Sequence, residues 1–436
     1  MSNLVVWILC IIYFICLSSL TSTANDDQDL FAFEPVRAQS LNVGTAKPRK
    51  RYLLYSINPG EGFNLRRDVY MRVASLVKMM NDKEDWTLVL PPWGPLYHWK
   101  TEGLKRDKYL WKTFFDIQSL NLYVPVIEFE DFLTENGPVI DDVLYLQHFE
   151  GDRFTGHFEE KIEETECIEA PRYSKHADGK YRGWFWGYER VAAKNFHCLS
   201  AQGFAAIVIP ALRSNYSKAR SVLIDRAETL LHNRYGDEDY WQARRSLRFA
   251  KPLIDMGDAF RRDRLDSTDD GDITTLHPDW RDHQVKPGHA IGGPYIAAHL
   301  RRRDFLYGHR DDVPSINRTA LQLLPLIEKY KAKKVFIASD APDEEFEELK
   351  LYIPIAIRYV PPKEILKKYG DGGVAIIDQW ICAHARYFVG TSVSTFSFRI
   401  QEEREILGFD PDVTFNRLCG DKQESCEQPA RWKIRY

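Results

Sequence analysis

Residues 51–70 read RYLLYSINPGEGFNLRRDVY, and the change of hydrophobic pattern within them predicts the fold. The apolar run from Tyr52 to Ile57 is typical of a short buried strand, whereas apolar residues between Leu65 and Met80 recur at helical spacing. A second strand-like run closed by prolines, WTLVLPPW, begins at Trp86. Strand, helix and strand in this order predict a βαβ unit, and therefore a parallel sheet with helices on its faces.

The same order returns in the second half of the chain. We expect the following elements there, in this order: strand 293–300, helix 320–330, strand 334–338, helix 344–351, helix 374–384 and strand 387–390. A charged, helix-rich stretch, 217–272, separates the two sets. The sequence thus predicts an α/β protein with two Rossmann-like domains facing a cleft, one at 48–260 and one at 261–436.

Length and charge narrow the class of protein. The chain has 436 residues, more than one hydrophobic core usually holds, so two domains agree with its size. It carries 59 basic and 63 acidic side chains, a formal net charge of -4. A nucleic-acid-binding protein would show a basic excess, so that class is disfavoured.

The first 24 residues predict entry into the secretory pathway. Leu4 to Leu20 is almost wholly apolar and is followed by small residues ending at Ala24, as in a signal peptide with its cleavage site. An uncleaved membrane anchor stays open as the alternative, since the apolar run approaches the length of a membrane span. Residues 25–47 are polar and are expected to form a flexible stem.

The cysteines suit an oxidising compartment. Five follow the leader, and we expect two disulfides and one buried thiol: Cys167 with Cys198, Cys419 with Cys426, and Cys382 alone. The sequons at Asn215 and Asn317 allow N-glycans on exposed loops. The sequence has no CxxC and no HExxH, so it signals neither a zinc site nor a dithiol active site.

Ligands of open parallel sheets bind beyond the carboxyl ends of the strands, and the first such end carries an acid. Glu61 lies between Gly60 and Gly62, directly before a predicted helix whose first amides are free to bind an anion. We expect the two glycines to take positive φ and to let the backbone approach a ligand closely. The plainer alternative is that Glu61 only complements the helix dipole.

Two further strand ends carry groups suited to phosphate. His299-Leu300-Arg301-Arg302-Arg303-Asp304 follows one predicted strand, and guanidinium groups bind phosphate oxygens in bidentate fashion. Residues 390–396, GTSVSTF, form a strand-to-helix turn rich in hydroxyls. The alternatives are a solvated charge run pairing with Asp304 and Asp311, and a simple helix cap at Ser394 or Thr395.

Three other features are weaker. Asp270-Gly271-Asp272 resembles a DxD metal motif, but it lies in a run of turn-forming residues, and an exposed loop is the better interpretation. The aromatic run 184–188, WFWGY, could bind carbohydrate, although packing is the commoner use of such rings. His98 and His309 indicate nothing by themselves.

Taken together, these stretches resemble one enzyme family. HLRRRD has the HxRRxD pattern of the fucosyltransferase superfamily, and its companions are LPPWGPLYHW, YRGWFWGYE and DGGVAIIDQWICAHARYFVGTSVSTFSFR. With residues 51–70 they make the chain similar to the protein O-fucosyltransferases that act on thrombospondin type 1 repeats, from about Arg51 to Tyr436.

The resemblance implies a GT-B fold and transfer of fucose from GDP-fucose to Ser or Thr of folded repeats on secreted or cell-surface proteins. It implies inversion at the anomeric carbon, no cofactor or metal, and a place in the endoplasmic reticulum lumen, although the C-terminus WKIRY has no KDEL-like signal. By position, Glu61 would be the base and Arg301 would bind the β-phosphate. The expected donor-site residues are Gly60, Gly62, Phe63, Asn64, His299, Arg301, Asp304, Asp378, Ser394, Thr395 and Phe396.

Overall fold

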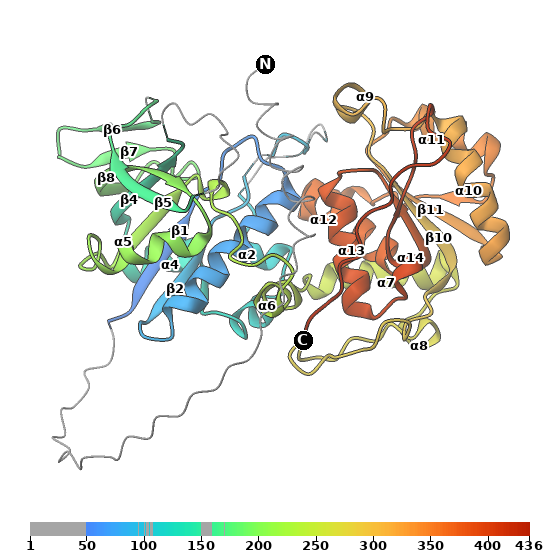
Figure 1. The fold of residues 1–436 in the computed structure, drawn as a ribbon, viewed down its shortest axis with the longest axis horizontal. Coiled ribbons are helices and arrows are strands. Elements are labelled where there is room, and N and C mark those ends of the chain that lie inside the picture. The colour runs from blue at the N-terminus through green and yellow to red at the C-terminus, as the bar shows by residue number, and fades with distance from the viewer. Residues whose placement is uncertain are drawn as a thin grey trace, which may run out of the picture. The chain divides into compact units, whose positions relative to one another are not determined.

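The structure is a computed structural model that describes residues 49–94, 96–99, 101, 104, 108–149, 159–169 and 171–436. The predicted signal peptide and stem lie outside these ranges. The compact unit comprises Pro48–Tyr436 and contains two sheets, one in each half of the chain (Figure 1).

The first sheet is built around parallel strands in the order β3-β2-β1-β9-β4-β8. Strands β5, β6 and β7 extend it in antiparallel fashion beside β8, a feature that the sequence interpretation did not include. The strands are β1 (Arg51–Tyr55), β2 (Trp86–Leu90), β3 (Val126–Glu128), β4 (Val139–Gln147), β5 (Lys161–Thr165), β6 (Tyr173–Lys175), β7 (Tyr181–Gly183), β8 (Ala192–Gln202) and β9 (Ser221–Asp225).

The second sheet is parallel throughout, in the order β12-β11-β10-β13-β14. Its strands are β10 (Gly293–Leu300), β11 (Lys334–Ser339), β12 (Ala356–Ile357), β13 (Ala385–Gly390) and β14 (Asn416–Arg417). The carboxyl ends of β10, β11 and β13 therefore meet at one edge, because parallel neighbours end on the same side.

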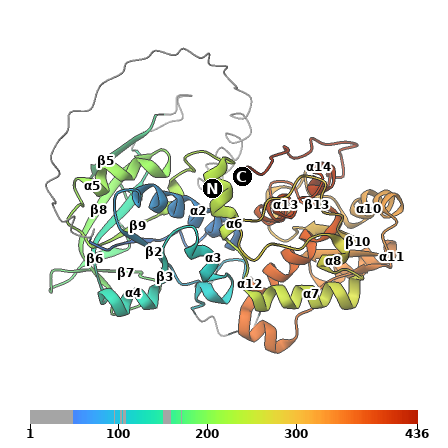
Figure 2. The same ribbon diagram turned by 90° about the horizontal axis from the view of Figure 1, so that it is seen from below.

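The helices connect and cover the strands (Figures 1 and 2). In the first half they are α2 (Phe63–Met80), α3 (Ile117–Asn121), α4 (Phe129–Asn136), α5 (Ile209–Arg213) and α6 (Glu238–Ser246), with 3-10 turns η2 (Trp111–Thr113), η3 (Ala205–Val208) and η4 (Ala227–Thr229). The others are α7 (Lys251–Leu265), α8 (Asp269–Asp272), α9 (Phe305–Gly308), α10 (Ile316–Tyr330), α11 (Asp343–Tyr352), α12 (Lys363–Ala383), α13 (Thr395–Leu407) and α14 (Pro411–Thr414).

The predicted alternation of strands and helices is confirmed in both halves. β10 has the predicted bounds, and α2 begins two residues before the expected start at Leu65. The predicted domain boundary at 260 lies inside α7, which packs closely on α12, since a Cβ at Gly257 would lie 2.6 Å from Cδ1 of Trp380. The exact division between the domains stays a prediction.

Hydrophobic spacing explains how the layers pack. On β10, Ile296 and Ala298 share a core with α10 and α11, whereas Tyr295 and Ala297 face the core that includes α12. This alternation is the period of a strand whose two faces are both covered by helices. On α2, the residues that set the helical spacing are all fully buried: Val69, Val73, Leu76, Val77 and Met80.

Both predicted disulfides are present, Cys167 with Cys198 and Cys419 with Cys426, and Cys382 is a free, buried thiol. The Asn215 and Asn317 side chains are exposed, but Asn317 lies in the first turn of α10 and not in a loop as expected. Within the described ranges, no helix has the length and apolar character that a bilayer span requires.

Candidate active site

Glu61 follows β1 and precedes α2, and it is 94% shielded from solvent, with 6% relative exposure. Its amide donates to the carbonyl of Asn58 at 3.0 Å, and Nε of Arg66 donates to the Glu61 carbonyl at 3.0 Å. Burial, reinforced by the nearby carboxylate of Glu228, raises the pKa of Glu61 to about 7, although Arg66 and Arg72 oppose the shift. A carboxylate with this pKa can accept a proton near neutral pH.

The flanking glycines do not take positive φ as predicted. Gly62 has φ −78°, and Gly60 also lies outside the positive-φ region. Gly62 packs closely instead: a Cβ there would lie 3.1 Å from Cδ2 of His98, so the imidazole would have to move by a few tenths of an ångström. The missing side chain thus lets the imidazole lie directly against the backbone next to Glu61.

Arg301 lies just beyond the end of β10, and its guanidinium is held by three groups. Nη2 donates to Asp304 at 2.5 Å and to Nδ1 of His98 at 3.1 Å, and Nη1 forms an ion pair with Asp340. The Arg301 amide donates to Oγ1 of Thr391 at 2.8 Å. His98 therefore packs beside Gly62 and also hydrogen-bonds the arginine.

Asp340 and His98 were not selected from the sequence as site residues. Asp340 directly follows β11, which pairs with β10 so that Ser339 lies opposite Leu300. In the sequence, Asp340 appears only as a polar residue after the strand KVFIAS. Its position points to Arg301 only once β11 is known to pair with β10. His98 lies in an aromatic segment without a periodic pattern, so the sequence offered no comparable signal.

His299 is buried near the end of β10 and is neutral. Burial, and secondarily the charge of Arg301, lowers the pKa of His299 to about 3. Its Nδ1 is 2.9 Å from Oγ of Ser397, and its ring stacks on Phe396 with centroids 4.3 Å apart. The structure thus brings the rings of His299 and Phe396 together.

The predicted phosphate turn lies between β13 and α13. Ser394 stands at the cap position of α13, but its side chain makes no capping hydrogen bond, which argues against the simple helix-cap interpretation. The first amides of α13 and this hydroxyl remain suited to an anion. Thr391 joins the turn to β10, since its Oγ1 donates to the His299 carbonyl at 2.9 Å.

Asn64, on α2, hydrogen-bonds to Gln379 of α12, the residue that follows Asp378. Oδ1 of Asn64 accepts from Nε2 of Gln379 at 2.8 Å and from Nη1 of Arg67 at 3.2 Å. This arrangement turns the amide nitrogen of Asn64 away from these two partners. Asp378 is adjacent to Gln379, and its Oδ1 is buried without a hydrogen-bond partner in the described part of the chain.

Burial raises the pKa of Asp378 well above its usual range. A buried carboxyl oxygen without a partner suits a polar ligand group, because such atoms are otherwise costly. Phe63 behaves differently. Its ring lies in the aromatic core, with its centroid 4.9 Å from that of Trp93 and 5.6 Å from that of Phe114, so the side chain itself serves packing.

Several residues of the weaker candidates have structural roles, whereas Asp270 and Trp184 are exposed. The stretch 270–272 is not an exposed loop as predicted, because it belongs to the short helix α8, where Asp270 is exposed and the buried Asp272 binds the guanidinium of Arg261 at 3.1 Å. No cluster that could hold a metal ion occurs among the described residues. In the aromatic run, Phe185 is buried, and Trp186 and Tyr188 pack on Phe129.

Comparison with known proteins identifies relatives along nearly the whole chain. The family model described as GDP-fucose protein O-fucosyltransferase matches residues 52–407. The human protein named GDP-fucose protein O-fucosyltransferase 2 is 53% identical over 93% of this chain and 94% of its own length. The proteins of that name from Caenorhabditis elegans and Drosophila melanogaster are 49% and 38% identical, over 89% and 88% of this chain and 91% and 82% of their own lengths.

Solved structures confirm the predicted fold class. POFUT1 in complex with GDP-fucose aligns with a TM-score of 0.55 at 17% identity, covering 86% of this chain and 99% of that one. POFUT1 in complex with GDP aligns with a TM-score of 0.53 at 18% identity and the same coverage. At such identities the likeness concerns the fold alone, here the GT-B arrangement of two Rossmann-like domains.

Proposed function

The chain belongs to the GDP-fucose protein O-fucosyltransferase family, and on this premise we propose that it fucosylates folded thrombospondin type 1 repeats with inversion at the anomeric carbon. It is an enzyme that uses GDP-fucose as donor and a protein as acceptor. The acceptor class, the residue roles and the stereochemistry are the proposed parts.

One arrangement of residues carries the proposal. Glu61 has a pKa of about 7, and His98 packs against the neighbouring Gly62 while hydrogen-bonding Arg301. A proton acceptor and a phosphate-binding cation are therefore linked through one imidazole. Acid-base help for the acceptor and charge stabilisation for the leaving group are the two needs of glycosyl transfer from a nucleotide sugar.

In the proposed step, the Ser or Thr oxygen attacks the anomeric carbon while its proton passes to the carboxylate of Glu61. The bond between that carbon and the β-phosphate oxygen breaks, and its electron pair leaves with GDP. Arg301 and the first amides of α13 meet the charge that develops on the phosphate. We expect no metal requirement, because these groups can supply the stabilisation. Attack from the opposite face inverts the configuration.

The other donor-site residues would orient the nucleotide and sugar. The amide nitrogen of Asn64 and the unpaired Oδ1 of Asp378 offer hydrogen-bonding groups. Ser394 and Thr395 stand where α13 begins, and Phe396 is fixed by its stacking on His299. Asp304 accepts a hydrogen bond from Arg301 and so orients it.

The acceptor is proposed from the relatives. The human, Caenorhabditis elegans and Drosophila melanogaster relatives are named GDP-fucose protein O-fucosyltransferase 2, and the branch with these motifs is expected to act on thrombospondin repeats. A fucosyltransferase acting on EGF-like repeats or on glycans is the second candidate. A non-catalytic lumenal quality-control binder is disfavoured, because it would need neither Glu61 at this pKa nor the held Arg301.

The two disulfides agree with folding in the secretory pathway, and we propose the endoplasmic reticulum lumen as the working compartment. The folded acceptors would be secreted or cell-surface proteins. We also propose that the boundary between the two domains lies near residue 260 and that Asn215 and Asn317 carry N-glycans.

The test is transfer of labelled fucose from GDP-fucose to a folded thrombospondin repeat, to the same repeat reduced and unfolded, and to a folded EGF-like repeat, with EDTA present. We expect label on the folded thrombospondin repeat alone. Label on the EGF-like repeat alone would replace the acceptor assignment, and loss of all transfer in EDTA would overturn the metal-free step.

A further inference from the structure

The turn between β13 and α13 contains an uncommon backbone conformation. Val393 has φ 49°, in the left-handed region, although it is a β-branched residue. Branching at Cβ makes this region strongly unfavourable, so a valine stays there only if its neighbours hold it. Such strain is found where a backbone must present groups to a ligand.

The residues before Val393 are held on two sides. Thr391 is tied to β10, with its Oγ1 accepting from the Arg301 amide at 2.8 Å and donating to the His299 carbonyl at 2.9 Å. Ser392 is tied to a different segment, since its Oγ accepts from Nη1 of Arg417 at 2.7 Å.

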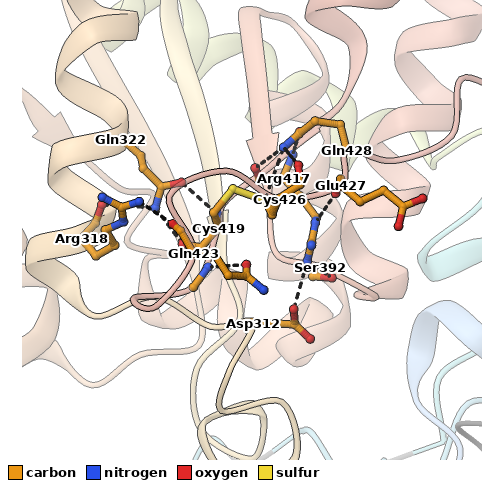
Figure 3. Close-up of a disulfide and its surroundings, with 11 residues drawn as sticks. Asp312, Arg318, Gln322, Ser392, Arg417, Cys419, Gln423, Cys426, Glu427 and Gln428 are labelled. Atoms are coloured by element: carbon orange, nitrogen blue, oxygen red, sulfur yellow. Dashed lines mark hydrogen bonds and ion pairs between the residues drawn. A yellow bond between two sulfur atoms is a disulfide. The ribbon is translucent and has the colours of Figure 1, made fainter.

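Arg417 lies on β14, the edge strand beside β13. Its side chain extends to Ser392 and Asp312 (Figure 3). Its Nη1 also forms an ion pair with Asp312 at 3.2 Å, and its Nε donates to the carbonyl of Glu427 at 2.5 Å. Its amide donates to Oε1 of Gln428 at 2.9 Å. The guanidinium is therefore fixed before it meets Ser392, and it connects the turn to the C-terminal segment.

That C-terminal segment is closed by the Cys419–Cys426 disulfide and docked on α10. The backbone of Cys419 and the side chain of Gln322 exchange two hydrogen bonds, of 2.8 Å and 2.9 Å. The chain then runs so close to the segment after α9 that a Cβ at Gly420 would lie 1.9 Å from the carbonyl oxygen of Asp311. No other residue fits at Gly420 without a shift of the backbone.

We infer that Arg417 is a positioning residue for the donor, which acts through Ser392 to hold the strained turn 391–394 in the shape that receives phosphate. The disulfide loop 419–426 is the frame that holds Arg417 in place. This inference rests on the proposed function, because it takes the turn to be the phosphate site. It gives a role in donor binding to Arg417 and to the loop 419–426, which make no proposed contact with the donor or the acceptor.

The first experiment measures the affinity of the intact protein for GDP by calorimetry. Arg417→Ala removes the clamp, and Ser392→Ala removes only its acceptor and leaves the Arg417–Asp312 pair. We expect both to weaken GDP binding, by about tenfold for Arg417→Ala, since a hydrogen bond to a charged group is lost. Lys422→Ala, in the same loop and paired with Asp311 on the surface, is the matched control and should bind GDP as the wild type does.

A second set of variants separates positioning from general stability. Glycine adopts the left-handed region freely, so Val393→Gly removes the strain that the clamp opposes. In that background, Arg417→Ala should weaken GDP binding much less than in the wild type. Equal losses in both backgrounds, or unchanged GDP binding in Arg417→Ala and Ser392→Ala, would overturn the inference. If the wild type itself does not bind GDP, the proposed donor site fails and the inference with it.

Discussion

Glu61 shows at the scale of one residue how the fold gives a side chain its chemistry. An exposed glutamate is ionised at neutral pH and is a weak base, whereas burial beside Glu228 raises the pKa of Glu61 to about 7. The backbone contacts of Asn58 and Arg66 fix the loop that carries it. The proposed base is therefore held in an environment that disfavours its charged form.

Because burial disfavours the charged form of Glu61, replacing this residue with an uncharged one should stabilise the folded protein, and more so at higher pH. Because the folded state binds the Glu61 proton more tightly, folded Glu61 keeps its proton between about pH 4.5 and pH 7 while the unfolded chain loses it. The free energy of unfolding therefore falls as pH rises through this window. Glu61→Gln removes the ionisation and should stabilise the protein by about 2 kcal/mol more at pH 8 than at pH 5, as measured by urea unfolding.

Glu348→Gln, on the exposed side of α11, is the control and should have the same small effect at both pH values. An equal effect of Glu61→Gln at pH 5 and pH 8 would contradict the raised pKa.

The sequence identified Glu61 through its glycine neighbours, but it suggested the wrong reason for Gly62. We expected positive φ, and the structure shows ordinary φ with His98 packed where a side chain would be. A close tertiary contact of this kind depends on a loop 36 residues further along the chain, which no local pattern reveals.

At the scale of elements, neighbouring strand ends assemble the cation site. Arg301 directly follows β10, Asp340 directly follows β11 and Thr391 directly follows β13, and parallel pairing brings the three together. The sequence located two of these ends as ligand-binding, because each carries several adjacent polar residues. It did not give the strand order, so Asp340 could not be assigned to the arginine.

Asp340→Ala should damage donor use by releasing Arg301. Asp340 forms an ion pair with the guanidinium and accepts from the Arg302 amide at 2.6 Å, so its loss frees both the side chain and the loop. We expect KM for GDP-fucose to rise about tenfold, with a smaller change in KM for the acceptor, from steady-state transfer kinetics.

Asp343→Ala serves as the matched control, because Asp343 is the first residue of α11, is exposed, and pairs with Arg358. A normal KM for GDP-fucose in Asp340→Ala would show that Asp340 does not position Arg301.

At the scale of the whole molecule, buried charges connect helices of the two sheets. Asp68 of α2 contacts Arg72, His232 and Arg399 of α13, at 2.9 Å, 3.1 Å and 3.3 Å. Arg67, also on α2, donates to Gln379 of α12 at 2.7 Å. Arg67 and Gln379, which both hydrogen-bond to Asn64, thus also belong to the contact between the halves of the chain.

Asp68→Ala should therefore destabilise the protein strongly, by about 3 kcal/mol, because it leaves buried cations without their partner. The measurement is urea unfolding near neutral pH. The exposed pair between Lys78 and Asp239, at 2.8 Å, gives the control, since Asp239→Ala should cost less than about 1 kcal/mol. Similar losses for both variants would mean that the buried network contributes little.

Little of this network could be predicted from the sequence. Hydrophobic spacing predicted the βαβ order and therefore both sheets, but a buried arginine has no pattern that distinguishes it from a surface one. Arg67 and Arg399 acquire their roles only when α2 and α13 meet, as the Asp68–Arg399 contact shows.

The central claim is that Glu61 accepts the acceptor proton while Arg301 meets the charge of the departing GDP. The most direct measurement is kcat/KM for fucose transfer to a folded thrombospondin repeat across pH, for the wild type and for Glu61→Gln, with GDP affinity measured in parallel. We expect the kcat/KM of the wild type to decrease as the pH is lowered through a single pKa near 7, because the reaction requires the carboxylate form of Glu61. Glu61→Gln should lose at least about a thousandfold in turnover while binding GDP nearly as the wild type does. Substantial turnover by Glu61→Gln, with the wild-type pH profile, would contradict the account.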